Sequence, residues 1–239
     1  MKTMNNIIFA DLSTYTPTAT IAFYEKVFGW KYREENAYYT AYKGSQEVVG
    51  LYETPEKFKQ MRMPHFWMTY IQVGDVNAIV EKAKALGGMV EVVDQTNAIG
   101  PLALIRDPQG AGFTIYSGNL FNTRTDAEKN TLIWNELHVS NMEKIIPFYQ
   151  GIFDWTFHEV EKDHYHIYTS DKTHIADALN IPTAYKGKYE YWVCTFGVGN
   201  LEEAKEAILR NGGSLIIEEG ERILFADHSG QAFFYAQEV

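Results

Sequence analysis

Apolar and polar residues alternate with a period of two in many short segments of the chain. Residues 5–13, NNIIFADLS, alternate as a half-buried strand does. The next stretch predicts a helix, because Thr16 can cap it, Pro17 suits the first helical position and Gly29 follows its end. Three more strands are expected in the runs WKYREE, YYTAYK and EVVGLYE. The resulting order is strand, helix and three strands.

The same order occurs three more times. HFWMTYIQV predicts a strand, and Asp75 can cap a helix that ends at Gly87 and Gly88. In the second half Asn141 and Asn200 can cap the corresponding helices. The predicted fold class is therefore α+β, with four βαβββ units whose neighbouring strands are mostly antiparallel, because hairpin-length turns join them.

Sequence repeats show that the chain consists of two similar halves. Four aromatic positions of FYEKVFGW recur in FYQGIFDW, 125 residues later. Two further blocks recur in the same order: VGDVNAIVEKAKALGG as VGNLEEAKEAILRNGG, and DPQGAGF as DHSGQAF. Repeats of this kind decide the architecture. We expect a first module at residues 1–118, a polar linker at 119–130 and a second module at 131–239.

Composition and charge narrow the range of partners. The chain has 46% hydrophobic and 15% aromatic residues, and its formal net charge is −10. Nucleic acid and anionic membranes are disfavoured as partners because both require a basic face, whereas a neutral or cationic small ligand fits. Cys194, the sole cysteine, lies in an apolar run and is expected to be buried. No apolar run suits a signal peptide or a membrane span, so we expect a cytoplasmic protein.

The repeated blocks resemble the vicinal oxygen chelate superfamily, which includes glyoxalase I, extradiol dioxygenases and the fosfomycin and bleomycin resistance proteins. The resemblance rests on the helix motif FYxxxFGW, the block VxDVxxxVxKAxxLGG and the DPxG turn. The segment WNEL at 134–137 is similar to the first strands of two-module bacterial glyoxalase-like proteins. The resemblance implies tandem modules whose curved, mixed sheets enclose cavities and carry their helices outside.

The resemblance also implies a divalent metal held by His, Glu or Gln side chains on particular strands. The equivalent positions here are Phe9, Met68 and Thr114 in the first module, and Trp134, Val193 and Phe234 in the second. None of these six side chains is the kind of ligand that the family uses. The interpretation is that no cofactor is bound and that the metal site is absent, with a divalent metal as the alternative.

The period of two predicts which other side chains share the cavity face. If Phe9 and Trp134 point into a cavity, Asp11 and Glu136 do so as well. The predicted ligand-binding residues are Phe9, Ser13, Met68, Tyr70, Thr114, Trp134, His138, Val193 and Phe234. A carboxylate buried among aromatic rings has a raised pKa and can act as a general base, which makes Asp11 and Glu136 the catalytic candidates. The alternative is that both only bond to tyrosine hydroxyls or backbone donors.

Five of the seven histidines lie between residues 138 and 174. The HYH segment puts His164 and His166 on one strand face, a spacing that can chelate a metal together with Glu136 and His138. The interpretation favoured by the sequence is instead a solvated hairpin whose histidines face water. His65 and His228 are interpreted as structural.

Two functional hypotheses follow. The first is a glyoxalase/bleomycin-resistance-like protein that binds a small apolar or cationic molecule in an aromatic cavity without the usual metal. The second is an enzyme, a lyase, isomerase or hydroxylase-like, that uses a buried carboxylate base or an atypical metal site. Both expect a small-molecule partner, and both a monomer and a homodimer fit, because two fused modules can pair within one chain.

Overall fold

The computed structural model describes residues 4–97, 99–182 and 190–239. Its first eight strands are β1 (Ile7–Thr14), β2 (Lys31–Glu35), β3 (Tyr38–Lys43), β4 (Gln46–Glu53), β5 (Phe66–Gln72), β6 (Met89–Asp94), β7 (Leu102–Arg106) and β8 (Gly112–Tyr116). The next eight are β9 (Leu132–Val139), β10 (Thr156–Glu161), β11 (His164–Tyr168), β12 (His174–Asn180), β13 (Tyr191–Val198), β14 (Ser214–Glu219), β15 (Arg222–Ala226) and β16 (Phe233–Glu238). The helices are α1 (Pro17–Phe28), α2 (Glu56–Gln60), α3 (Val76–Ala85), α4 (Met142–Phe153) and α5 (Leu201–Arg210).

The strands form two eight-stranded sheets with matching orders. The first sheet runs β2-β3-β4-β1-β5-β8-β7-β6, and the second runs β10-β11-β12-β9-β13-β16-β15-β14. Hairpin neighbours are antiparallel, whereas β1 with β4, β5 with β8, β9 with β12 and β13 with β16 are parallel pairs. The α+β class and the four βαβββ units are therefore confirmed. Among the elements in the described part of the chain, only the short helix α2 was not predicted from the sequence.

The helix starts follow the predicted capping chemistry at three of four positions. The side chains of Asp75, Asn141 and Asn200 each accept a hydrogen bond from the backbone N–H three residues later, at 2.9–3.2 Å. Thr16 makes no such bond, and α1 relies on Pro17 at its first turn. Gly29 ends this helix with a left-handed φ of 71°.

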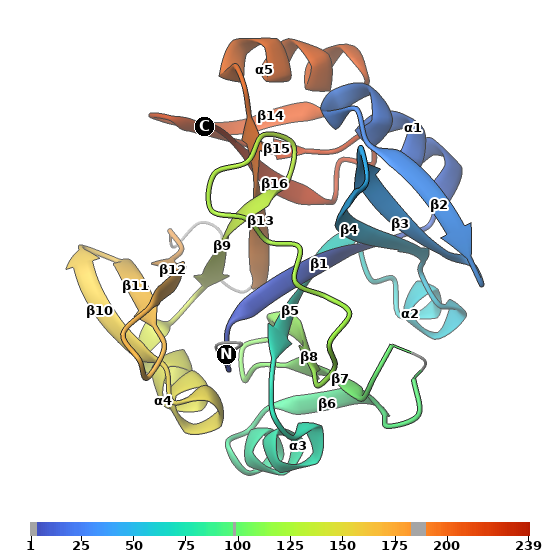
Figure 1. Cartoon of the computed structure of the whole chain (residues 1–239). Helices are drawn as coiled ribbons and strands as arrows, with labels where there is room; N and C mark the ends of the chain where they lie inside the picture. Colours follow the sequence, from blue (N-terminus) through green and yellow to red (C-terminus); the bar gives the residue numbers. More distant parts are fainter. Residues whose placement is uncertain (1–3, 98, 183–189) are drawn as a thin grey trace. The chain divides into compact units, whose positions relative to one another are not determined.

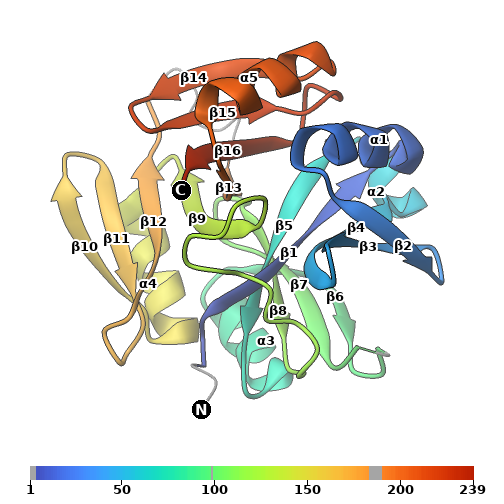
Figure 2. The same ribbon diagram turned by 45° about the horizontal axis from the view of Figure 1, so that its top comes forward.

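The chain forms two compact units, each built from parts of both sequence repeats. Unit 1 comprises Met1–Ile8, Thr69–Asn122 and Asn135–Val193, and unit 2 comprises Phe9–Met68, Thr123–Trp134 and Cys194–Val239. Helices α3 and α4 contact each other in unit 1, as α1 and α5 do in unit 2 (Figures 1 and 2). Each sheet contains the strands of one sequence repeat, whereas each compact unit combines segments of both repeats. The module boundaries at residues 118 and 131 therefore stay a prediction.

The repeated aromatic motif fills the core of each unit. In unit 2, Tyr24 stacks on Trp30 at 5.6 Å between ring centroids and accepts a hydrogen bond from Trp67 Nε1 at 3.2 Å. In unit 1, Tyr149 stacks on Trp155 at 5.6 Å and accepts the equivalent bond from Trp192 at 3.1 Å. Rings in these geometries add packing energy to the burial of their area. The motif is therefore architectural in both units.

The DPxG turn is organised by one buried carboxylate. Asp107 Oδ1 accepts hydrogen bonds from the backbone N–H groups of Gln109, Gly110 and Ala111 at 2.8–3.1 Å. Its Oδ2 accepts a bond from the Tyr149 hydroxyl at 3.1 Å. Burial nevertheless raises the pKa of Asp107 to about 6. The motif thus ties the β7–β8 turn to α4 within unit 1.

Candidate functional site

The strands that carry the predicted site residues each present one face to a hydrophobic core. On β1, Ala10 and Leu12 belong to the unit 2 core, so Phe9, Asp11 and Ser13 lie on the opposite face. On β9, Leu137 and Val139 belong to the unit 1 core, which leaves Glu136 and His138 on the opposite face. By the same alternation, Met68, Tyr70, Thr114 and Val193 also lie on strand faces turned away from the cores. Trp134 belongs to neither core and lies on the same face of β9 as Glu136. Their ligand-binding role stays a prediction.

Phe234 differs from the other predicted ligand-binding residues because it lies in the core. Its ring packs against Tyr24 of α1, with 5.9 Å between the ring centroids. The backbone explains the difference: Asp107 N–H bonds to the oxygen of Ala111, four residues later, whereas Asp227 N–H bonds to that of Ala232, five residues later. The second turn is one residue longer. Tyr235, and not Phe234, therefore occupies the strand face that Thr114 occupies in the first repeat.

Asp11 is a buried carboxylate among tyrosines in unit 2. The Tyr38 hydroxyl donates a hydrogen bond to Asp11 Oδ2 at 3.1 Å. Burial, followed by the charge of Asp11, raises the pKa of Tyr52 far above its usual value. Gly50 is opposite Asp11 in the β1–β4 register and leaves space for the Tyr38 ring. These contacts agree with the structural alternative for Asp11, and its catalytic role stays a prediction.

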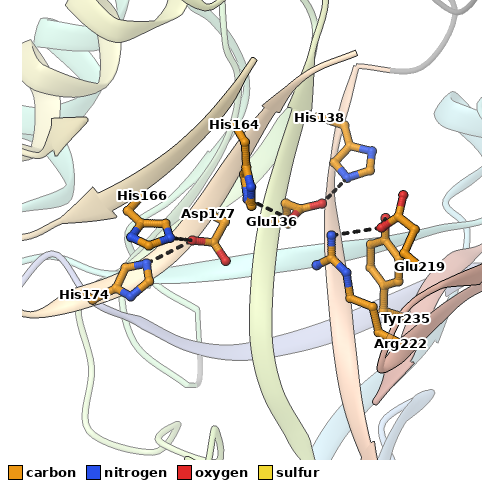
Figure 3. Close-up of polar contacts among 9 residues, drawn as sticks. All are labelled: Glu136, His138, His164, His166, His174, Asp177, Glu219, Arg222 and Tyr235. Atoms are coloured by element: carbon orange, nitrogen blue, oxygen red, sulfur yellow. Dashed lines mark hydrogen bonds and ion pairs between the residues drawn. The ribbon is translucent and has the colours of Figure 1, made fainter. Parts of the chain in front are cut away.

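Glu136 has two histidines beside it in unit 1. It is fully buried, and its Oε1 lies 2.6 Å from His138 Nε2. Its Oε2 lies 3.8 Å from Nε2 of His164 on β11 (Figure 3). Glu136 pairs with Asp177 in the parallel register of β9 and β12. The buried carboxylate is thus next to a second carboxylate on the neighbouring strand.

Asp177 has its own pair of histidines. His174 Nε2 lies 2.9 Å from Asp177 Oδ1, and His166 Nε2 lies 3.7 Å from the same oxygen. Figure 3 shows both imidazoles directed at Asp177. The side chains of His164, His166 and His174 are only 31–32% exposed. Their interpretation as a solvated hairpin is therefore wrong, although His158 on β10 is exposed as expected.

A β-bulge places His174 and Asp177 on one face. In a regular strand, residues three apart point to opposite faces. The register between β11 and β12 shifts so that Ile167 is opposite Ala176 while Tyr168 is opposite His174. Ile175 and Ala176 both enter the core, and the extra residue turns His174 to the face of Asp177. The sequence did not show the direction of His174 because this bulge has no simple sequence signal, and it did not show the place of Asp177 because that depends on the pairing of β12 with β9.

Tyr168 supports the two histidines that face Asp177. Its hydroxyl lies 3.3 Å from His166 Nδ1, so that His166 Nε2 is the nitrogen directed at the carboxylate. The Tyr168 ring stacks on His174 at 4.9 Å between centroids. Burial, partly opposed by the charge of Asp177, lowers the pKa of His166, which favours the neutral imidazole that binds metals.

Figure 3 also shows a polar cluster that belongs to unit 2. Glu219 Oε2 accepts hydrogen bonds from Arg222 Nη2 and from the Tyr235 hydroxyl, each at 3.1 Å. The Arg222 guanidinium lies over the Tyr235 ring at 4.1 Å from its centroid. The charge of Arg222 is therefore balanced within the cluster.

Two groups of side chains in unit 1 have the composition and spacing of metal ligands. They are His166, His174 and Asp177 in one group, and Glu136, His164 and Asp177 in the other. Within each group the ligand atoms lie within 4.8 Å of one another. Imidazole and carboxylate ligands together suit divalent transition metals. The residues present thus fit a metal, at positions other than the six that the resemblance implied.

Comparisons with known proteins agree on the family. The family model described as Glyoxalase/Bleomycin resistance protein/Dioxygenase superfamily matches residues 8–115. A Mycobacterium bovis protein named "Putative glyoxylase CFP32" is 28% identical over 222 residues, which cover 88% of this chain and 84% of that protein. None of the described helices is long and apolar enough to span a membrane.

Solved structures share the fold over nearly the whole chain. The 2,3-dioxygenase LapB from Pseudomonas sp. KL28 has a TM-score of 0.66 at 13% identity, and the alignment covers 99% of this chain and 93% of that one. The Mn(II)-bound glyoxalase from Novosphingobium aromaticivorans has a TM-score of 0.65 at 14% identity, with 98% and 82% covered.

The expectation that no cofactor is bound is wrong. It rested on the six positions that the resemblance implied, and it assigned the hairpin histidines to solvent although their spacing could chelate a metal. The structure brings histidines and carboxylates of β9, β11 and β12 together as potential metal ligands, and a protein of the same fold binds Mn(II). Residues 8–115 thus match the glyoxalase/bleomycin resistance/dioxygenase superfamily in sequence, and both repeats share the fold of solved dioxygenases and a glyoxalase, so the chain is similar to proteins of that superfamily.

Proposed function

We propose that the protein is a metal-dependent enzyme of the glyoxalase type, with a divalent metal held by His166, His174 and Asp177. The observation that carries the proposal is the convergence of both imidazole Nε2 atoms on Asp177 Oδ1, at 3.7 and 2.9 Å. Two histidines and one carboxylate on one side of a metal leave positions open for a substrate, as in non-haem iron sites.

The substrate class follows from the donor set and from the named relative. A bound divalent metal would polarise substrate oxygen atoms as a Lewis acid. A small molecule with two adjacent oxygen atoms suits the open positions best. The similarity to a protein named as a glyoxylase supports a 1,2-dicarbonyl compound or its thiol adduct.

The protein's own residues hold the three ligands in place. The Tyr168 hydroxyl next to His166 Nδ1 fixes the ring so that Nε2 faces Asp177. The rings of His166 and His174 lie 4.3 Å apart between centroids, so each restricts the other. The bulge in β12 fixes the direction of His174. Such support reduces the reorganisation needed when a metal binds.

Metal analysis and a matched pair of histidine variants test this proposal. The purified protein is expected to retain Mn(II), Fe(II) or another divalent metal and to convert a 1,2-dicarbonyl compound, with or without a thiol. Chelation should abolish turnover, and added metal should restore it. His174→Ala should lose more metal affinity than the roughly 10–100-fold that removal of an outer-shell partner costs.

His158→Ala is the control for this experiment, because His158 is exposed on the adjacent strand and belongs to neither ligand group. It should keep metal and activity. A wild-type protein that binds no divalent metal after incubation and dialysis would contradict the proposal. Activity that is equal in the His174→Ala and His158→Ala variants would contradict it as well.

A further inference from the structure

Glu136, His164 and Asp177 form a second group of ligands beside the proposed one. The two groups share Asp177; the other members of this group come from β9 and β11, and those of the proposed group come from β11 and β12. A carboxylate has two oxygen atoms and can bind two metal ions at once. The sharing of Asp177 therefore raises the question of whether the site holds one ion or two.

The environment of His164 favours a site that holds two ions. Its Nε2 is buried and has no hydrogen-bond partner among the residues that the structure describes. The nearest carboxylate oxygen, Glu136 Oε2, lies 3.8 Å away, which is too far for a hydrogen bond. Two ligand atoms that bind the same metal ion, each at about 2 Å from it, lie roughly 3–4 Å apart. The separation fits a shared metal ion.

The arrangement of charge supports the same conclusion. The ligand oxygens of Glu136 and Asp177 lie within 4.8 Å of each other, and Glu136 is fully buried. Two ionised carboxylates at this separation repel each other, and burial of Glu136 reduces the screening of that repulsion by water. A divalent cation between them converts this repulsion into attraction.

We infer that unit 1 contains a binuclear metal centre in which Asp177 bridges two divalent ions. His166 and His174 complete the first position, as in the proposed function on which this inference rests. Glu136 and His164 complete the second position. Paired ions of this kind lie about 3.5–4 Å apart and bind an oxygen anion between them.

The inference gives a defined role to His138. Its Nε2 lies 2.6 Å from Glu136 Oε1, which leaves Oε2 directed toward His164. An imidazole that orients a ligating carboxylate in this way is a positioning residue outside the coordination sphere. Glu136 is in this arrangement a metal ligand, and the substrate would contact the metal pair.

Titration of the metal-depleted protein with Mn(II), followed by metal analysis and electron paramagnetic resonance, tests the inference. Wild type should bind about two Mn(II) ions per chain with the coupled spectrum of a bridged pair. His164→Ala should retain one uncoupled ion. Glu136→Gln should behave in the same way, which covers the case that His164→Ala does not fold. His158→Ala should bind as wild type does.

The outcomes separate this inference from the proposed function. Saturation at one ion per chain, with His164→Ala unchanged, would overturn the binuclear centre and leave the proposed mononuclear site intact. Binding of no ion would overturn both. Two ions without magnetic coupling, or two ions that survive Asp177→Asn, would show that Asp177 is not a bridge and would refute the inference.

Discussion

Replacement of Asp107 by asparagine tests whether burial or hydrogen bonding controls the carboxyl group in the DPxG turn. Asp107 is 3% exposed and accepts three backbone N–H bonds, which favour the charged form. Burial favours the neutral form and raises its pKa from 3.8 to about 6. Asparagine has the same shape and keeps an oxygen for the backbone donors, but it does not titrate.

The sign of the effect follows from proton linkage. Because the folded-state pKa lies above the unfolded one, the folded protein binds more protons between these two values, and the free energy of unfolding falls as pH rises. A shift of about 2 pKa units corresponds to about 3 kcal/mol in total. About 2 kcal/mol of this should be lost between about pH 4.5 and pH 7.

The assay is urea unfolding of wild type and Asp107→Asn at a series of pH values, followed by tryptophan fluorescence. The difference between the two proteins isolates Asp107, because the other titrating groups are shared. Wild type should lose about 2 kcal/mol relative to Asp107→Asn as pH rises over this range. The Tyr149 hydroxyl bond lowers the pKa of Asp107, so Tyr149→Phe should move the loss to higher pH. A difference that is constant from pH 4.5 to pH 7 would refute the reasoning.

Two further predictions concern single side chains. Tyr168→Phe removes the hydroxyl next to His166 Nδ1 and should weaken Mn(II) binding by roughly 10-fold, measured by calorimetry, with His158→Ala as the control; unchanged affinity would show that Tyr168 does not orient the ligand. Gly50→Ala would place a Cβ 1.9 Å from the Tyr38 hydroxyl oxygen and should lower the free energy of unfolding by about 1–3 kcal/mol. In Gly74→Ala the new Cβ meets only the flexible end of Met4 at 3.3 Å, and equal losses in the two variants would contradict this steric argument.

Most of the fold could be predicted because its signals are local. The caps at Asp75, Asn141 and Asn200 are single side chains next to the helices that they start. The DPQGAGF and DHSGQAF blocks lie 120 residues apart, five fewer than the other repeated blocks, and this difference falls between strands, since residues 95–101 separate β6 from β7 and residues 220–221 separate β14 from β15. Helix α2 was missed because a five-residue helix carries almost no periodicity.

The candidate site was harder to predict because it depends on register. The alternation correctly placed Glu136 and His138 on one strand face, and the HYH spacing singled out His164 and His166. The sequence did not show that Asp177 pairs with Glu136, or that His174 reaches the same face. Both depend on pairing between strands, and one extra residue in a strand reverses the direction of every side chain beyond it. The single-residue difference between the two DPxG turns misplaced Phe234 for the same reason.

The bulge that directs His174 has a counterpart in the first repeat. There, Ala41 is opposite Val49 while Tyr42 is opposite Glu47, and Val48 and Val49 both enter the core. Counting from the bulge, Glu47 corresponds to His174 and Gly50 to Asp177. The two copies thus share a backbone frame and differ in the side chains mounted on it.

Because the backbone is shared, the two repeats can keep the same fold while their side chains, and hence their chemistry, diverge. After a duplication, one copy of such a frame can gain or lose a reactive centre through a few substitutions, with no change in the path of its backbone. The half without the histidines is then a natural reference for the half that has them. Placing His164, His166, His174 and Asp177 at the corresponding positions of the first repeat would test how few substitutions this backbone needs to form a metal site.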